Sequence, residues 1–102
     1  MIESSYIWEV GSFGIIWDKK AFTCTEQGST CAETIAAFAM SNEGLALAMV
    51  YIDGVNRRRT GERLTKREDR DAQVRTLEHE ARRIFALGRQ KAHAAWLDRV
   101  GE

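Results

Sequence analysis

The sequence predicts an α+β fold, in which an N-terminal three-stranded antiparallel β-meander at about residues 5–26 is followed by two or three α-helices packed on its apolar face, at about residues 30–58 and 66–99. Three observations predict this class. A glycine-led turn separates two segments rich in apolar residues, capping sequences precede apolar runs, and a long segment near the end has helical periodicity. The 102 residues, 44% hydrophobic and 29% charged, suffice for a single folded domain spanning 1–102 and are too few for two.

The meander begins with a hairpin whose two-residue loop is Gly11-Ser12. Glycine in the first loop position accepts the positive φ that such a turn requires. The turn fixes the register of the first two strands, and because side chains alternate, it gathers large apolar residues on one face. The expected cross-strand pairs are Val10 with Phe13, Trp8 with Ile15, and Tyr6 with Trp17.

A second turn, around Lys19-Lys20, places Trp17 opposite Phe22 and Ile15 opposite Cys24 in a third strand. The other face is expected to be mainly polar, with two apolar exceptions, Ile7 and Ile16. A sheet with one apolar face needs a helical layer to cover it.

The first helical segment is expected to begin at Thr30, because residues 30–33 match the capping box that satisfies the free donors of a helix N-terminus. Ser41 offers a second N-cap, so the segment 30–58 is either continuous or broken at Ser41. Residues 45–52 are almost entirely apolar, and a helix that is apolar all round must be covered on all sides.

Gly61 suits the left-handed position after a helix, and residues 65–68 form a second capping box that opens the segment 66–99. Gly88 lies within the apolar stripe of this segment, where it either admits a close helix contact or marks a break. The stripe has 3.6-residue periodicity and comprises Val74, Leu77, Ala81, Ile84, Phe85, Gly88, Ala92, Ala95 and Trp96.

No signal-peptide pattern follows Met1, and no apolar stretch approaches the roughly 20 residues of a membrane span, so we expect a cytoplasmic protein that does not act in a membrane. In that compartment Cys24 and Cys31 are expected to be reduced thiols, although their spacing leaves a disulfide between them open.

No metal site, cofactor or catalytic centre is expected. His79 and His93 would lie about 21 Å apart on one helix, too far to share an ion. Cys24 is expected to face the core as an inert thiol, whereas Cys31, in the first turn of a helix, is the better placed of the two to react but has no histidine near it in sequence. The glycines form no phosphate-binding loop.

Charge is unevenly distributed, although the chain is neutral overall. Residues 1–56 carry seven acidic and two basic side chains, which leaves a net charge of +5 on the remainder. The most basic segment connects the two helical regions, and we call its seven basic residues the basic elbow: Arg57, Arg58, Arg59, Arg63, Lys66, Arg67 and Arg70.

These features favour a non-enzymatic, small protein-binding module that uses the basic elbow to bind a larger protein partner. Small inhibitors from phages or mobile elements, such as anti-defence proteins, often have this size and lack catalytic residues, so by analogy such a role is expected. The alternative is a nucleic-acid-binding regulator whose elbow contacts phosphates. An enzyme whose site is assembled only by the fold is a third, less supported, possibility. The surplus of apolar helical surface also predicts a homodimer built on helices.

Overall fold

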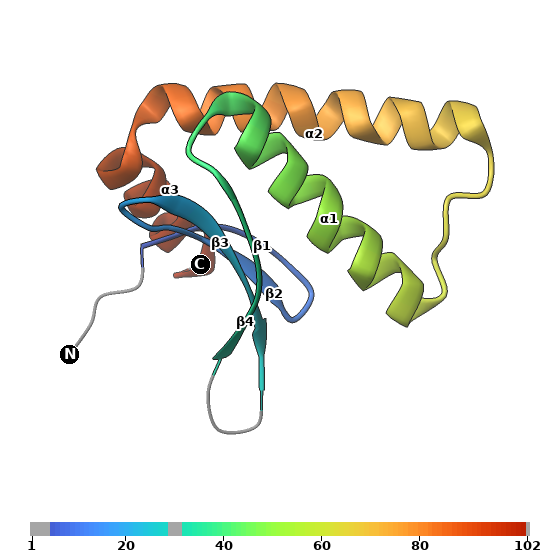
Figure 1. The fold of residues 1–102 in the computed structure, drawn as a ribbon, viewed down its shortest axis with the longest axis horizontal. Helices are drawn as coiled ribbons and strands as arrows, with labels where there is room; N and C mark the ends of the chain where they lie inside the picture. The colour runs from blue at the N-terminus through green and yellow to red at the C-terminus, as the bar shows by residue number, and fades with distance from the viewer. Residues whose placement is uncertain (1–4, 29–31, 102) are drawn as a thin grey trace.

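A computed structural model describes residues 5–28 and 32–101 and has the predicted α+β architecture. One antiparallel sheet precedes three helices (Figure 1). The elements are β1 (Tyr6–Val10), β2 (Phe13–Trp17), β3 (Ala21–Gln27), β4 (Ala32–Ala39), α1 (Asn42–Thr60), α2 (Arg67–Leu87) and α3 (Arg89–Val100).

The predicted hairpins are confirmed at most positions. Gly11 has a φ of 58°, as the two-residue turn requires, and Val10 pairs with Phe13 across it. The pairs Trp8–Ile15, Ile15–Cys24 and Trp17–Phe22 also form as predicted. The alternation of side chains therefore places the buried residues Phe13, Ile15, Phe22 and Cys24 on one face of the sheet.

The expected pair of Tyr6 with Trp17 is wrong, because β1 changes register between Tyr6 and Trp8 and Tyr6 lies opposite Ile16. A residue inserted into one strand reverses the alternation of the side chains that follow or precede it. As a result Ile7, expected on the polar face, is buried, and Tyr6 contacts Gly14 and Thr25 on the side away from Ile15.

The helix expected from Thr30 is also wrong: residues 32–39 form β4, a fourth strand, so the sheet order is β1-β2-β3-β4. β4 pairs with β3 at every residue except Ile35, with Phe38 opposite Phe22 and Ala36 opposite Cys24. Thr30 and Cys31 lie outside the described residues. Glu33 lies in a strand, so the predicted capping box does not open a helix there.

The first helix starts instead at the second of the two expected N-caps. Ser41 is extended, and its Oγ accepts a hydrogen bond from the backbone N–H of Gly44 at 2.9 Å. Gly61 ends the helix with a φ of 77°, as predicted, and its N–H is directed to the carbonyl of Arg57. Between these caps, α1 buries Leu45, Ala48, Met49 and Ile52 against the sheet.

The second predicted helix is divided at Gly88, whose φ of 83° and ψ of 163° end α2 and precede α3. The break was one of two alternatives open for this glycine. The capping box at residues 65–68 does not form, since Lys66 is the N-cap and no side chain caps it.

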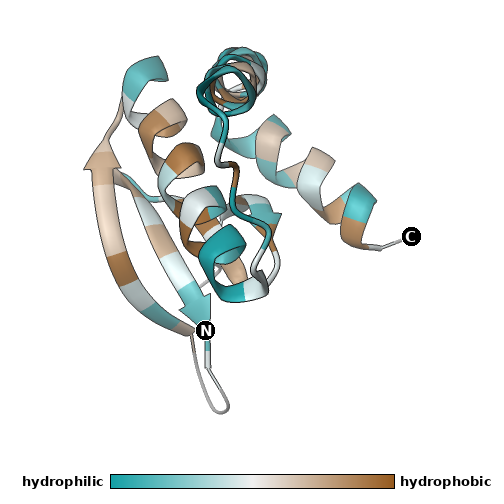
Figure 2. Cartoon of the chain, turned by 90° about the vertical axis from the view of Figure 1, so that its right-hand side faces the viewer, coloured by the Kyte–Doolittle hydropathy of each residue, from teal (hydrophilic) through white to brown (hydrophobic). Residues whose placement is uncertain are grey.

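The helices cover one face of the sheet and its β1 edge. Figure 2 shows the sheet on one side, α1 beside it, and α3 on the side opposite β4. Phe85 of α2 stacks on Trp17 at 5.3 Å and meets the edge of Phe22 at 6.1 Å. α3 packs against β1, so the last helix covers the first strand.

Candidate binding cleft

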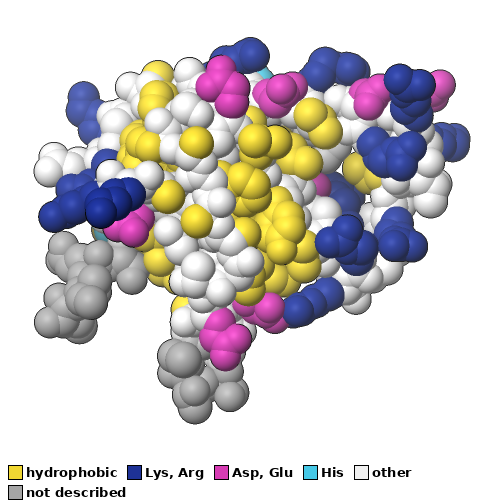
Figure 3. Space-filling model, viewed as in Figure 1, with side chains coloured by type: hydrophobic (Ala, Val, Ile, Leu, Met, Phe, Trp, Pro, Cys, Tyr) yellow, Lys and Arg dark blue, Asp and Glu magenta, His cyan; other side chains and the backbone are white. Residues whose placement is uncertain are grey.

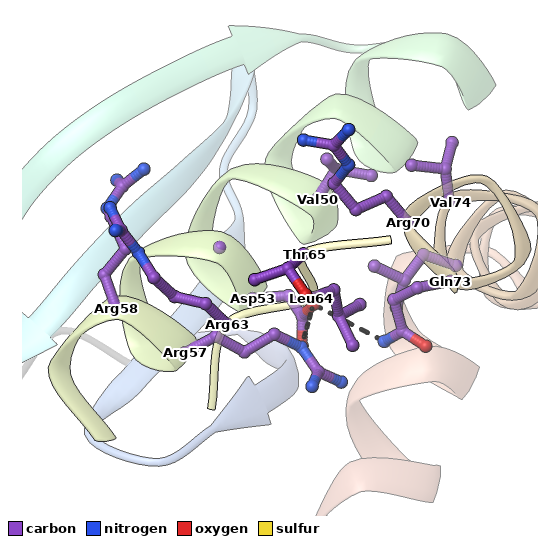
Figure 4. A pocket seen from close by; sticks show the side chains of 12 residues that line it. Val50, Asp53, Arg57, Arg58, Arg63, Leu64, Thr65, Arg70, Gln73 and Val74 are labelled. Carbon is purple, nitrogen blue, oxygen red and sulfur yellow. Dashed lines mark hydrogen bonds and ion pairs between the residues drawn. The ribbon is translucent and has the colours of Figure 1, made fainter. Parts of the chain in front are cut away.

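The basic elbow lies where α1 and α2 diverge. In Figure 1 the two helices lie close together near the start of α1 and separate toward the 61–66 connection. The space between them is a cleft of about 510 Å³, which we call the α1–α2 cleft (Figure 4). Its walls come from the C-terminal half of α1, the connection, and the N-terminal half of α2.

The helices diverge because only one end of α2 carries large buried side chains. α2 buries Leu77, Ala81 and Ile84. The turns before Leu77 have charged and exposed residues on most positions, including Arg70 and Val74. Since burial of apolar surface is what holds helices together in water, the first turns of α2 have little to hold them against α1.

Four members of the basic elbow line the cleft: Arg57, Arg58, Arg63 and Arg70. They come from three segments, α1, the connection and α2, and Figure 4 shows them distributed around the space. Arg58, Arg63 and Arg70 are exposed. Guanidinium groups present planar sets of donors suited to carboxylates and phosphates, so the rim of the cleft is built to attract an anionic group.

One acidic side chain, Asp53, lies inside the cleft and organises part of it. It is only 8% exposed. Its Oδ2 accepts hydrogen bonds from Arg57 Nε at 2.9 Å and from Gln73 Nε2 at 3.4 Å, which joins α1 to α2. The carboxylate therefore neutralises and orients Arg57, while the other three arginines of the cleft have no carboxylate within 4.0 Å among the described residues.

The remaining walls are largely apolar. Val50, Leu64, Val74 and Leu77 line the cleft, and none of its lining residues is aromatic. Val74 is 36% exposed, which is high for an apolar side chain that faces another helix. The cleft thus combines an apolar floor with a cationic rim, the combination that binding sites use to hold an amphipathic group in one orientation.

The other three members of the basic elbow do not line the cleft. Arg59 donates to both carboxylate oxygens of Glu26 on β3, and its guanidinium lies 5.1 Å from the centre of the Phe13 ring. The hydrogen bonds that Arg59 donates to Glu26 raise the pKa of Arg59. Arg67 lies 3.8 Å from Asp71, and Lys66 is the N-cap of α2. Sequence reasoning grouped all seven residues, and the fold brings four of them together.

Sequence reasoning missed the polar and apolar partners of these arginines. Asp53 carried one detectable signal, since it precedes Arg57 by four residues, the spacing of an ion pair along a helix, whereas nothing in the sequence marked Gln73. Val50 and Val74 belonged to runs expected to be covered. Nothing in their periodicity distinguishes a covered position from the floor of a cleft.

The other candidate residues have structural surroundings. His79 is exposed on α2, and His93 of α3 bonds through Nδ1 to the carbonyl of Tyr6 at 2.8 Å. Cys24 is a free, fully buried thiol whose pKa is raised by burial to about 12. Within residues 5–28 and 32–101, no three side chains of the metal-binding types gather, and no helix has the length and apolar content to cross a bilayer.

Family models, curated proteins and solved structures were all compared with the chain, and none of them matches it.

Proposed function

We propose that this protein is a non-enzymatic binding module that holds an acidic, partly apolar segment of a larger protein in the α1–α2 cleft. The observation that carries the proposal is the composition of the cleft, in which exposed arginines from three segments surround an apolar floor. An acidic side chain of the partner would meet the rim, and an apolar side chain beside it would cover Val50, Leu64 and Val74. A protein that binds in this way acts by occluding or reshaping its partner.

Nucleic acid is the competing ligand, and two features favour the protein segment. The cleft has no aromatic residue on which a base could stack, and stacking supplies much of the affinity for single strands. Duplex binding needs cations spread along a surface, whereas Arg59 and Arg57 are already paired with Glu26 and Asp53. Figure 3 shows several basic side chains on the side of the molecule where the α1–α2 connection lies, and others around the rim of the face, whose middle is apolar.

A displayed library of random peptides, selected on the immobilised protein, tests the proposal. We expect enrichment of peptides in which acidic residues adjoin apolar ones, with affinities that fall as salt is added. Arg58→Ala and Arg70→Ala should each weaken such a peptide about 10-fold or more, because each removes a charge from the rim. Arg67→Ala is the matched control, since Arg67 belongs to the same basic run and does not line the cleft.

A second variant separates the shape of the cleft from its charge. A Cβ at Gly54 would meet no atom within 4 Å, so Gly54→Leu extends an apolar side chain into the cleft and leaves every arginine in place. Peptide binding should be lost in this variant while the circular dichroism spectrum is kept. Mixed-sequence DNA or RNA bound with submicromolar affinity, and weakened equally by Arg58→Ala and Arg67→Ala, would instead establish an extended phosphate clamp and reject the proposal.

A further inference from the structure

One edge of the sheet is covered by a helix and the other is not. β1 forms one edge and α3 packs against it, with His93 bonded to the Tyr6 carbonyl and Trp96 stacked on the Tyr6 ring. β4 forms the other edge, and none of the described elements pairs with its outer side. An uncovered edge presents a row of free backbone donors and acceptors to any strand that approaches it.

β4 also lacks most of the features by which proteins protect such edges. It has no proline, lysine or arginine, and its single charged residue is Glu33. One protective feature is present, a register shift that leaves Ile35 unpaired between Thr34 and Ala36. The regular part of the edge is therefore residues 36–39, where Ala37 and Ala39 are exposed and small enough to admit a neighbouring backbone.

We propose that β4 is a homodimer interface, in which a second copy of this chain pairs antiparallel with residues 36–39 about a two-fold axis at Ala37. Directly opposed residues in an antiparallel pair share a face, so a two-fold axis must pass through a residue position for the inner faces to coincide. With the axis at Ala37, each Phe38 lies opposite the partner's Ala36, a large residue beside a small one. Residues 36–39 carry no charged side chain, so no like charges meet in the paired segment.

Side chains next to β4 extend this surface on the inner face. Tyr51 of α1 is 39% exposed and its ring lies 5.8 Å from that of Phe38, and Leu47, one turn earlier, is 58% exposed. Figure 3 shows a band of hydrophobic side chains across the middle of the face on which α1 and β4 lie. Pairing of four residues alone would bury much less accessible surface than the roughly 1,200 Å² that a stable interface buries. The exposed side chains of Tyr51 and Leu47 add apolar surface to the interface.

A second copy fits this edge better than a longer assembly. Because α3 covers the β1 edge, pairing two β4 strands leaves no free edge among the described strands, and the assembly closes at two subunits. The sequence predicted a dimer built on helices because residues 45–52 and the stripe from Val74 to Trp96 offer more apolar helical surface than one small sheet can cover. The strand at residues 32–39 supplies a different self-complementary surface.

Light scattering coupled to size exclusion of the full chain, at micromolar concentrations, gives the first test. We expect the mass of a dimer for the wild type and of a monomer for Ala37→Glu, which places two carboxylates opposite each other at the axis. Ala86→Glu, a change at an exposed alanine of α2, is the matched control and should stay dimeric. A monomeric wild type, or a dimeric Ala37→Glu, overturns the proposal.

Disulfide trapping locates the interface without destabilising it. In a Cys31→Ser background, Ala37→Cys should form an intermolecular disulfide under mild oxidation, because opposed Cα atoms of an antiparallel pair lie about 4.5–5.5 Å apart, within the range that a disulfide spans. Ala86→Cys should not. A dimer that Leu47→Glu dissociates but that Ala37→Cys fails to trap is a helix-based dimer and contradicts strand pairing. Arg58→Ala should leave the dimer intact, so this test is independent of the cleft.

Discussion

The ring of Tyr6 in β1 stacks on the ring of Trp96 in α3, with 5.4 Å between ring centres and 29° between ring planes. The same helix also bonds to the backbone of Tyr6, since His93 Nδ1 lies 2.8 Å from its carbonyl oxygen. A carbonyl only accepts, so the hydrogen of this bond belongs to Nδ1. The first strand and the last helix are thus held together by one stack and one hydrogen bond.

Replacing Trp96 with alanine should release α3 from β1. The half-buried indole supplies the stacking surface, so we expect Trp96→Ala to lower the free energy of unfolding by about 2 kcal/mol, measured by urea denaturation. Trp96→Phe is the matched control. It keeps an aromatic ring and removes Nε1, which is buried without a hydrogen-bond partner among the described residues, so its stability should change little. Equal losses in both variants would show that the stack contributes nothing.

The two glycines of α1 should respond in opposite ways to alanine. A Cβ at Gly44 would lie 1.7 Å from the backbone oxygen of Ala39, so Gly44→Ala must displace the junction of β4 and α1 and should cost about 3 kcal/mol. At Gly54 a Cβ meets nothing within 4 Å, and Gly54→Ala should stabilise the helix by about 0.5–1 kcal/mol. Thermal melts of the two variants test this prediction. A Gly44→Ala variant as stable as the wild type would contradict the close approach of Gly44 to the backbone of Ala39.

Replacing Gly11 with valine should destabilise the first hairpin turn for two reasons that can be measured separately. The φ of 58° at Gly11 disfavours a β-branched residue, and a Cβ there would lie 2.2 Å from Asn56 Oδ1. We expect Gly11→Val to lower the free energy of unfolding by about 2–3 kcal/mol in thermal melts. Adding Asn56→Ala should restore only the part due to the contact. An unchanged melting temperature in Gly11→Val would contradict the left-handed conformation of Gly11.

Cys24 should make the protein sensitive to alkali. Burial raises its pKa from 9.0 to about 12, so the folded state keeps the thiol proton over a range in which the unfolded chain loses it. Because the folded state then binds more protons, stability should fall as the pH rises from about 9 toward 12, by up to about 1.4 kcal/mol per pH unit. Cys24→Val removes this titration, so the free energies of unfolding of the two proteins, measured by urea denaturation, should differ by a constant below pH 9 and by a changing amount above it. Parallel profiles above pH 9 would contradict the assignment.

The strands were predictable where the local pattern was regular. Gly11 set the first turn and with it the pairs Val10–Phe13 and Trp8–Ile15, because a tight turn fixes register by geometry alone. The prediction for Tyr6 and Ile7 was wrong because the irregularity between Tyr6 and Trp8 shifts the alternation by one residue. No turn residue marks that position in the sequence.

β4 was missed for a related reason. Ile35 and Phe38 are three positions apart, a helical spacing, and the alanines around them favour a helix. The spacing arises because Ile35 is an extra residue in the strand, and the strand exists because β3 offers Phe22 and Cys24 as cross-strand partners. Pairing with β3 therefore outweighed the local helix preference of residues 32–39. Contacts between distant segments also separated Arg59, which binds Glu26, from the four arginines of the cleft.

The conformation of Gly88 lets α3 turn back from α2 and pack against β1. Its φ of 83° with ψ of 163° is a region that residues with a side chain scarcely enter. Any other residue there would favour one uninterrupted helix over residues 67–100, roughly 50 Å long. Such a rod would carry Trp96 away from β1 and leave the β1 edge of the sheet uncovered as well as the β4 edge. A sheet with two uncovered edges can add copies without limit. In the proposed dimer, the conformation of this one glycine therefore leaves no uncovered edge among the described strands at which a third copy could pair.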